Sequence, residues 1–421
     1  MKLKSIIFPI SGLILTSCSQ TDEVEYPNFS TPTSEDEYFR PLDEAVSLAK
    51  SVLEVTTSTR ASEPTLQSIE TLLPSQTGYV GDKDSEPSFY LLNYANNEGF
   101  ALISTDNRRP ALYAFSDSGN LHISDTIGNP ALTSYLTAVN IPYEESLNIT
   151  LPTDSLKYEF NPKLPPTTTR YFDDGYLSLE VKPLFTGNMQ DWSQSALNKY
   201  VKEGRYETTP VGCVALAVGQ IMAYYKQPSQ WPIDQAEYDK ADERYTFDWD
   251  ILQHRTVHDD IARFMEILGR PQYLNMNYGK LESGTYMSQY TKRTFKSLGY
   301  EDNIIESEFD FSKAAKLLYY QQPLLMKSTR PKGSGHAFTI DGYIRWFSVR
   351  VESDGSTRPD RYYFHFVWGN WGATNGYYLY DPKLKIFNQK PTFISGHEGS
   401  SGGFDEDYDK YYMFYNFTPK R

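Results

Sequence analysis

Residues 210–225 read Pro-Val-Gly-Cys-Val-Ala-Leu-Ala-Val-Gly-Gln-Ile-Met-Ala-Tyr-Tyr, and this stretch decides the fold. Pro and Gly before Cys213, followed by an uninterrupted apolar run, indicate a buried helix that begins at or next to the cysteine. A thiol there lies at the positive end of the helix dipole, beside backbone N–H groups that lack a helical partner, and both favour the thiolate. The stretch therefore predicts a thiol poised to react at the start of a core helix.

Cysteine usage supports a reactive role for Cys213. The sequence holds two cysteines, and the other, Cys18, lies in an N-terminal segment that resembles an export signal. A single remaining thiol cannot form an intramolecular disulfide, and an exported protein that keeps one is expected to need its reactivity. The alternative is a buried cysteine that acts as a small hydrophobic residue.

A nucleophilic cysteine needs a base, and His336 is the best candidate among the six histidines. It lies in residues 333–343, Gly-Ser-Gly-His-Ala-Phe-Thr-Ile-Asp-Gly-Tyr, where small residues leave the ring accessible. Phe338 and Ile340 alternate with polar partners, as expected of a strand anchored in a core. The segment predicts a histidine presented at the start of a strand.

A third segment, residues 368–378, reads Trp-Gly-Asn-Trp-Gly-Ala-Thr-Asn-Gly-Tyr-Tyr. Together with the cysteine and histidine segments, it resembles the streptopain family of papain-like cysteine peptidases. Order and spacing agree over most of residues 175–420. Further matching strings occur at residues 181–184, 192–194, 247–250, 275–279 and 283–284.

The resemblance implies a role for each matching residue. Cys213 would attack the peptide carbonyl as a thiolate, and His336 would pair with it and protonate the leaving amine. Gln194 matches the family's oxyanion-hole glutamine, whose side-chain amide would join the Cys213 backbone N–H in binding the developing negative charge.

The position that orients the histidine departs from the family pattern. Family members carry Asn-Trp-Gly-Trp here, but a gapless match puts Val367 on the asparagine and Trp368 on the first tryptophan. Valine cannot accept a hydrogen bond from imidazole. Either Asn370 takes the orienting role through a local shift, or backbone and Trp368 support the ring and the enzyme is slower.

The expected fold class is α+β. The peptidase part, residues 176–421, is expected to form the two lobes of a papain-like enzyme, with a helical lobe carrying the nucleophile against an antiparallel sheet carrying the base. Residues 37–150 predict a smaller α+β domain. Its expected elements are a helix from Leu42 to Leu53, a hairpin of residues 88–93 and 99–104, a third strand at residues 111–115 and a helix at residues 130–139. In the peptidase part we expect helices at residues 259–268 and 311–320, and strands at residues 323–326, 338–343, 344–351 and 362–368.

The domain before the peptidase holds neither a thiol nor a plausible base. Residues 99–110 are similar to the inhibitory propeptide of streptopain-like precursors, which implies that this domain covers the cleft and displaces the catalytic groups until it is removed. A permanent accessory domain is the alternative. Residues 151–175, rich in proline and threonine, predict a linker in which maturation cuts the chain.

The N-terminus predicts where the protein acts. Residues 1–17 have the shape of a bacterial lipoprotein signal, with Lys2 and Lys4 before a short apolar run, and Cys18 would be acylated after the cut. An ordinary secretory signal is the alternative. Residues 18–36 are polar and predict a disordered tether. We therefore expect an extracytoplasmic protein, anchored by lipid to a bacterial membrane at the cell envelope or surface, and released from it after maturation if the cut precedes the peptidase part.

The remaining patterns exclude other functions. A net charge of -14 disfavours nucleic acid as a partner. No phosphate-binding loop or dinucleotide fingerprint is present, so no cofactor is expected. His254 and His258 have the spacing of two metal ligands on a helix, but no third ligand stands out, and no metal is expected.

These observations predict the zymogen of a cysteine endopeptidase, acting on protein or peptide substrates and inhibited by its own propeptide. One alternative is a catalytically weak or silent relative that binds proteins at the surface. Another is acyl transfer with the same Cys-His chemistry.

Overall fold

The computed structural model describes the chain in twelve stretches, all within the compact unit Tyr38–Arg421. These stretches are residues 38–56, 64–73, 87–126, 129–140, 168–201, 205–230, 248–256, 259–329, 335–349, 355–356, 358–380 and 410–420. The predicted signal, residues 1–17, the tether, residues 18–36, and most of the linker lie outside them. In the described part of the chain, no helix is long and apolar enough to cross a membrane.

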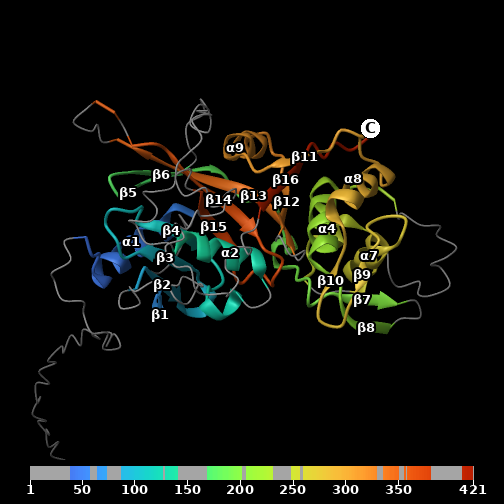
Figure 1. Ribbon diagram of the computed structural model, residues 1–421, viewed down its shortest axis with the longest axis horizontal. Helices are drawn as coiled ribbons and strands as arrows, with labels where there is room; N and C mark the ends of the chain where they lie inside the picture. The colour runs from blue at the N-terminus through green and yellow to red at the C-terminus, as the bar shows by residue number, and fades with distance from the viewer. Residues whose placement is uncertain are drawn as a thin grey trace, which may run out of the picture. The chain divides into compact units, whose positions relative to one another are not determined.

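Within these stretches, twelve strands form one sheet (Figure 1). Ten of them follow the order β1-β2-β3-β4-β15-β14-β13-β12-β16-β11, while β6 pairs with β13 and β5 pairs with β6. Neighbouring strands pair antiparallel. The strands are β1 (Leu66–Leu72), β2 (Phe89–Tyr94), β3 (Phe100–Ser104), β4 (Leu112–Ser116), β5 (Thr168–Phe172), β6 (Gly175–Val181), β11 (Ile305–Glu308), β12 (Leu324–Thr329), β13 (Gly335–Ser348), β14 (Arg361–Val367), β15 (Gly376–Tyr380) and β16 (Lys410–Tyr415). Two short pairs lie apart from it: β7 (Asn198–Val201) with β8 (Arg205–Pro210), and β9 (Asn277–Tyr278) with β10 (Ser283–Gly284).

The helix that begins at the cysteine is the centre of the helical lobe. Helix α4 (Cys213–Tyr225) is apolar on nearly all sides and buries Val214 to Ala223, as predicted for a core helix. It packs against β13, β12 and α7. The other α-helices are α1 (Leu42–Thr56), α2 (Pro130–Val139), α6 (Trp249–Leu252), α7 (Asp259–Gly269), α8 (Met287–Ser297) and α9 (Phe311–Tyr319).

Strand β13 separates two hydrophobic cores. Phe338 and Ile340 belong to a core that covers one face of the sheet, while Ala337 belongs to the core around α4 on the other face. This alternation follows from the two-residue period of a strand. A break had been expected near Tyr343, between two strands, and this expectation is wrong. Strand β13 is continuous from Gly335 to Ser348, and its pairing with β14 contains a bulge between Ile340 and Gly342.

The N-terminal domain contains the elements that the sequence predicts. Helix α1, the β2–β3 hairpin, strand β4 and helix α2 follow in the expected order. The predicted α+β class, with helices packed against an antiparallel sheet, is confirmed. The sequence did not reveal that β4 pairs with β15 of the peptidase part, so that one sheet and one core run through both domains.

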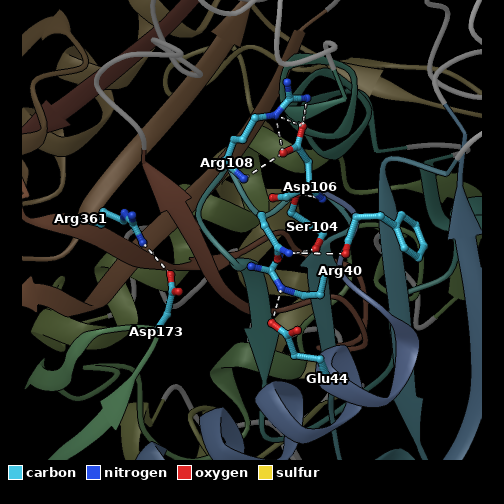
Figure 2. Close-up of polar contacts among 9 residues, drawn as sticks. Arg40, Glu44, Ser104, Asp106, Arg108, Asp173 and Arg361 are labelled. Atoms are coloured by element: carbon cyan, nitrogen blue, oxygen red, sulfur yellow. Dashed lines mark hydrogen bonds and ion pairs between the residues drawn. The ribbon is translucent and has the colours of Figure 1, made fainter. Parts of the chain in front are cut away.

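Arg40 fixes the start of the N-terminal domain to the turn after β3 (Figure 2). Its side chain is 4% exposed, donates through Nη1 to the Ser104 carbonyl oxygen at 2.6 Å, and pairs through Nε with Glu44 at 3.1 Å. In the next turn, Asp106 pairs with Arg108 at 2.6 Å. Burial alone would raise the pKa of Asp106, but the bonds and charge of Arg108 hold it below its usual value.

Candidate active site

Gly212 allows Cys213 to sit at the first turn of α4. Gly212 has a φ of 86°, and a Cβ there would lie 2.4 Å from the Ser283 carbonyl oxygen. Only glycine fits both the conformation and the space. The Leu216 N–H then donates to the Gly212 carbonyl oxygen at 3.2 Å, so the helix begins at the cysteine. The thiol is half-buried and free of disulfides.

His336 is held at the start of β13 by its neighbour on β12. The His336 backbone N–H donates to the Ser328 hydroxyl oxygen at 3.1 Å, and that hydroxyl donates back to the His336 carbonyl oxygen at 3.3 Å. The ring is buried, with Nε2 at 3.0 Å from the Trp368 carbonyl oxygen. A carbonyl oxygen only accepts hydrogen bonds, so Nε2 carries a hydrogen and Nδ1 remains for the thiol.

The structure brings Cys213 and His336 together. Burial alone would raise the pKa of the Cys213 thiol. A hydrogen bond and the charge of His336, with the backbone N–H groups of Ala337 and Cys213, outweigh burial and lower that pKa below its ordinary value. The arrangement stabilises a thiolate beside an imidazolium.

The segment that follows β14 contacts the His336 ring through a backbone carbonyl. Val367 is fully buried in the core around α4, and Trp368 is fully buried in the core on the other face of the sheet. Asn370 is half-buried and accepts the Ala373 N–H through its carbonyl oxygen at 3.2 Å. Within the described residues, the bond to His336 Nε2 comes from Trp368, and the Asn370 side chain makes none to that ring.

Gln194 lies against the same segment. Its backbone N–H donates to the Gly369 carbonyl oxygen at 3.1 Å. The turn before it, η5 (Met189–Asp191), is tied to α4 because the Gln220 side-chain amide donates to the Met189 carbonyl oxygen at 2.8 Å. The Gln194 segment is thus anchored both to the helix of Cys213 and to the loop that contacts His336.

Two groups at the site were not singled out from the sequence. The first is Asn375, which accepts the Trp368 N–H through Oδ1 at 3.0 Å. The second is a buried pair in which His365 Nδ1 lies 2.6 Å from Asp341 Oδ1. Asp341 also accepts the Phe185 N–H at 2.9 Å, so this pair ties the sheet to the chain leading toward Gln194.

The other predicted positions lie apart from this site or outside the description. His254 Nδ1 bonds to the Asp250 carbonyl oxygen at 2.7 Å, and His258 is outside the described residues, as is Cys18. The described stretches contain no cluster of three or more His, Cys, Asp or Glu side chains that could hold a metal.

The N-terminal domain touches the loop that follows Trp368. The Asn120 backbone N–H donates to the Ala373 carbonyl oxygen at 2.9 Å. A Cβ on Gly119 would lie 2.2 Å from that same oxygen, so glycine permits the close approach. The domain therefore contacts the segment that positions the histidine.

Two protein families match successive parts of this chain. Residues 192–378 match the Peptidase C10 family, and residues 34–141 match the Spi protease inhibitor. The thiol protease/hemagglutinin PrtT of Porphyromonas gingivalis is 25% identical over 347 residues, covering 75% of this chain and 36% of that protein. Streptopain of Streptococcus pyogenes is 25% identical over 358 residues, covering 77% of this chain and 80% of streptopain. A solved fragment of Prevotella intermedia prointerpain A has a TM-score of 0.43 at 18% identity, covering 84% of this chain and 100% of the fragment.

The sheet, the cysteine helix and the two matched regions define a cysteine peptidase preceded by an inhibitor-like domain. Residues 192–378 belong to the peptidase C10 family, and the chain is similar to streptopain.

Proposed function

We propose that this chain is the precursor of a cysteine endopeptidase in which Cys213 is the nucleophile and His336 is the base and acid. One observation carries the proposal. The thiol at the first position of α4 bonds to His336, and Trp368 holds the other ring nitrogen of that histidine at 3.0 Å. These are the relationships that a thiolate–imidazolium pair requires.

In the first half of the reaction, the Cys213 thiolate attacks the carbonyl carbon of the scissile peptide bond. A sulfur–carbon bond forms, and the carbonyl electron pair moves onto oxygen. The Cys213 N–H at the helix start and the Gln194 side-chain amide would donate to this oxyanion. When the carbon–nitrogen bond breaks, the leaving nitrogen takes the proton from His336, and an acyl-enzyme remains.

In the second half, His336 takes a proton from water while the water oxygen attacks the acyl carbon. The sulfur–carbon bond then breaks, which releases the carboxylic acid and restores the thiolate and imidazolium. Throughout, the Trp368 carbonyl would fix the ring tautomer, because it can accept only from a protonated Nε2. A backbone acceptor thus supplies the orienting contact that Val367 cannot, which supports an active enzyme over a silent relative.

The N-terminal domain would keep the enzyme latent. Its strand β4 extends the peptidase sheet through β15, and Asn120 holds the loop after Trp368. Latency would come from a covered cleft, and from restraint of that loop in a way that displaces the catalytic groups. A permanent accessory domain is the alternative, and it predicts full peptidase activity before any cut.

We also propose that Cys18 carries the lipid that anchors the protein outside the cytoplasm. The support is the signal-like pattern of residues 1–17 alone. Substituting Cys18 by Ala should abolish labelling by a radioactive fatty acid and move the protein from the membrane fraction to the soluble extracytoplasmic fraction. Persistent labelling and membrane association of that variant would contradict the anchor.

Intact-mass analysis over time tests the peptidase proposal. A chain beginning at Ser19, in reducing buffer, should lose an N-terminal fragment that ends in or next to the proline-rich linker, residues 151–175. Its Cys213→Ala counterpart should stay whole. If both stay whole and the parent also resists a thiol-directed epoxide, the silent surface-binding alternative is favoured. Supplying a competing amine with a peptide substrate then separates hydrolysis, which gives the free acid, from acyl transfer, which gives a new amide.

A further inference from the structure

The peptide unit that contacts His336 is held at both ends. On one side, the Trp368 N–H donates to Asn375 Oδ1 at 3.0 Å. On the other, the Gly369 carbonyl oxygen accepts the Gln194 N–H at 3.1 Å. The carbonyl that meets His336 lies between these two anchors, so its direction depends on both.

Asn375 uses both ends of its amide in this arrangement. While Oδ1 accepts from Trp368, Nδ2 donates to the Gln190 carbonyl oxygen at 2.8 Å. Its backbone N–H closes the local turn by donating to the Gly372 carbonyl oxygen at 3.1 Å. The residue is only 4% exposed, so water does not readily replace these bonds. One buried side chain thus joins the segment that contacts His336 to the segment that leads to Gln194.

We propose that Asn375 is a positioning residue that fixes the Trp368 backbone, so that its carbonyl oxygen holds the His336 ring toward the Cys213 thiol. The inference rests on the proposed function of these two residues. Where the family resemblance implies an asparagine in direct contact with the histidine, this chain has Val367. The buried amide of Asn375 does not contact His336 itself but acts on it through the main chain of Trp368.

Two substitutions separate positioning from a purely structural role. Asn375→Ala removes both side-chain bonds. Asn375→Asp keeps an oxygen acceptor for the Trp368 N–H and loses only the donor to Gln190, while burying a carboxylate that lowers Tm. If Asn375 acts through Trp368, the aspartate variant recovers much of the activity that the alanine variant loses, even though both are less stable. Thr374→Val is the matched control, since the Thr374 hydroxyl is buried in the same loop without a partner among the described residues.

The experiment makes two measurements. The first is peptide hydrolysis by the fully processed chain, divided by the number of active sites that react with an epoxide. The second is the pH profile of Cys213 alkylation by iodoacetamide. Asn375→Ala should lower kcat by about 10- to 100-fold with little change in KM, as expected for a misplaced catalytic group. It should also move the midpoint of alkylation to higher pH, because His336 no longer stabilises the thiolate. Asn375→Asp should lie between Asn375→Ala and the parent, and Thr374→Val should match the parent.

The inference is overturned if Asn375→Ala keeps the parent kcat per active site and the parent alkylation profile, or if Asn375→Asp is as impaired as Asn375→Ala. A failure of the proposed function looks different. In that case the parent hydrolyses no peptide, while the alkylation profiles still report whether Asn375 controls the thiol through His336. An alkylation midpoint common to all variants then overturns the inference on its own.

Discussion

The Trp368 carbonyl oxygen lies 3.0 Å from Nε2 of His336, so a main-chain atom occupies the place that the family pattern gives to a side-chain amide. No substitution of Trp368 by another amino acid removes this acceptor. Mutations can change only where it points, by acting on the residues that hold the peptide. A mutational test of this contact must therefore change the surroundings of Trp368 rather than Trp368 itself.

Restoring the family asparagine should not improve the enzyme. Val367 is fully buried in the core around α4, where an amide would lack partners. We expect Val367→Asn to lower the free energy of unfolding by about 1–3 kcal/mol, the cost of burying an unpaired polar group, and to leave kcat no higher. Val367→Ala is the control for lost volume. Urea unfolding and peptide turnover measure both, and a kcat above the parent's would show that the side chain can reach His336.

We expect the enzyme to require glycine at position 369 for two reasons. Other residues are strained in this backbone conformation, and a side chain here would collide with Leu216. The φ of Gly369 is 78°, and a Cβ would lie 2.7 Å from Leu216 Cδ2 on the helix of Cys213. Gly355 has a similar φ of 83° but open space around it, so Gly355→Ala measures conformational strain alone. We expect both alanine variants to lose about 1 kcal/mol of stability, with a larger loss for Gly369→Ala. Only Gly369→Ala should lower kcat, and equal kcat values in the two variants would contradict this role.

The reactivity of Cys213 should depend on pH as its surroundings dictate. Burial alone would raise the thiol pKa, but the bond and charge of His336 lower it, so the thiolate forms at lower pH than usual. Alkylation by iodoacetamide should therefore reach half its maximal rate below about pH 8.5, the ordinary thiol value. In His336→Ala, burial still raises the thiol pKa but no imidazole lowers it, so the midpoint of alkylation should move to higher pH. His254→Ala serves as the matched histidine control, and an unchanged midpoint in His336→Ala would exclude the ion pair.

The sequence predicts those parts of the fold and site that have local signals. Gly212 before an apolar run predicts a helix starting at Cys213, and small residues around His336 predict its place at the start of a strand. Support of His336 by backbone and Trp368 was one of two alternatives that the sequence left open, beside a contact from Asn370. The choice between them could not be predicted, because every residue has a carbonyl and its direction depends on distant anchors such as Asn375. The catalytic roles of these residues remain predictions that the experiments above test.

Long-range pairing was also beyond prediction. Strands β4 and β15 are separated by most of the chain, and each has an ordinary pattern of aromatic and aliphatic residues. Nothing in either pattern specifies the partner, since strands pair through backbone groups that all residues share. The same reason explains why the bulge at Gly342 was missed and β13 was expected to end near Tyr343.

This shared sheet predicts that cutting the linker will not separate the two domains. Phe115 stacks on Tyr377 with ring centroids 5.1 Å apart, and the Tyr363 hydroxyl donates to the Leu112 carbonyl oxygen at 3.2 Å, both across the boundary. In a Cys213→Ala chain with a specific protease site inserted in the linker, the fragments should elute together after cleavage.

Tyr363→Phe should weaken the association of the two fragments by about 1 kcal/mol, or roughly fivefold in the dissociation constant, because one buried hydrogen bond is lost. Tyr343→Phe is the control, since that buried hydroxyl has no partner among the described residues. Fragments that separate in native buffer would contradict a shared core, and equal dissociation constants for the two variants would exclude the Tyr363 bond as a contributor. Retention of the cleaved domain would mean that activation needs its unfolding or digestion as well as the cut, because β15 is paired as long as the domain stays folded.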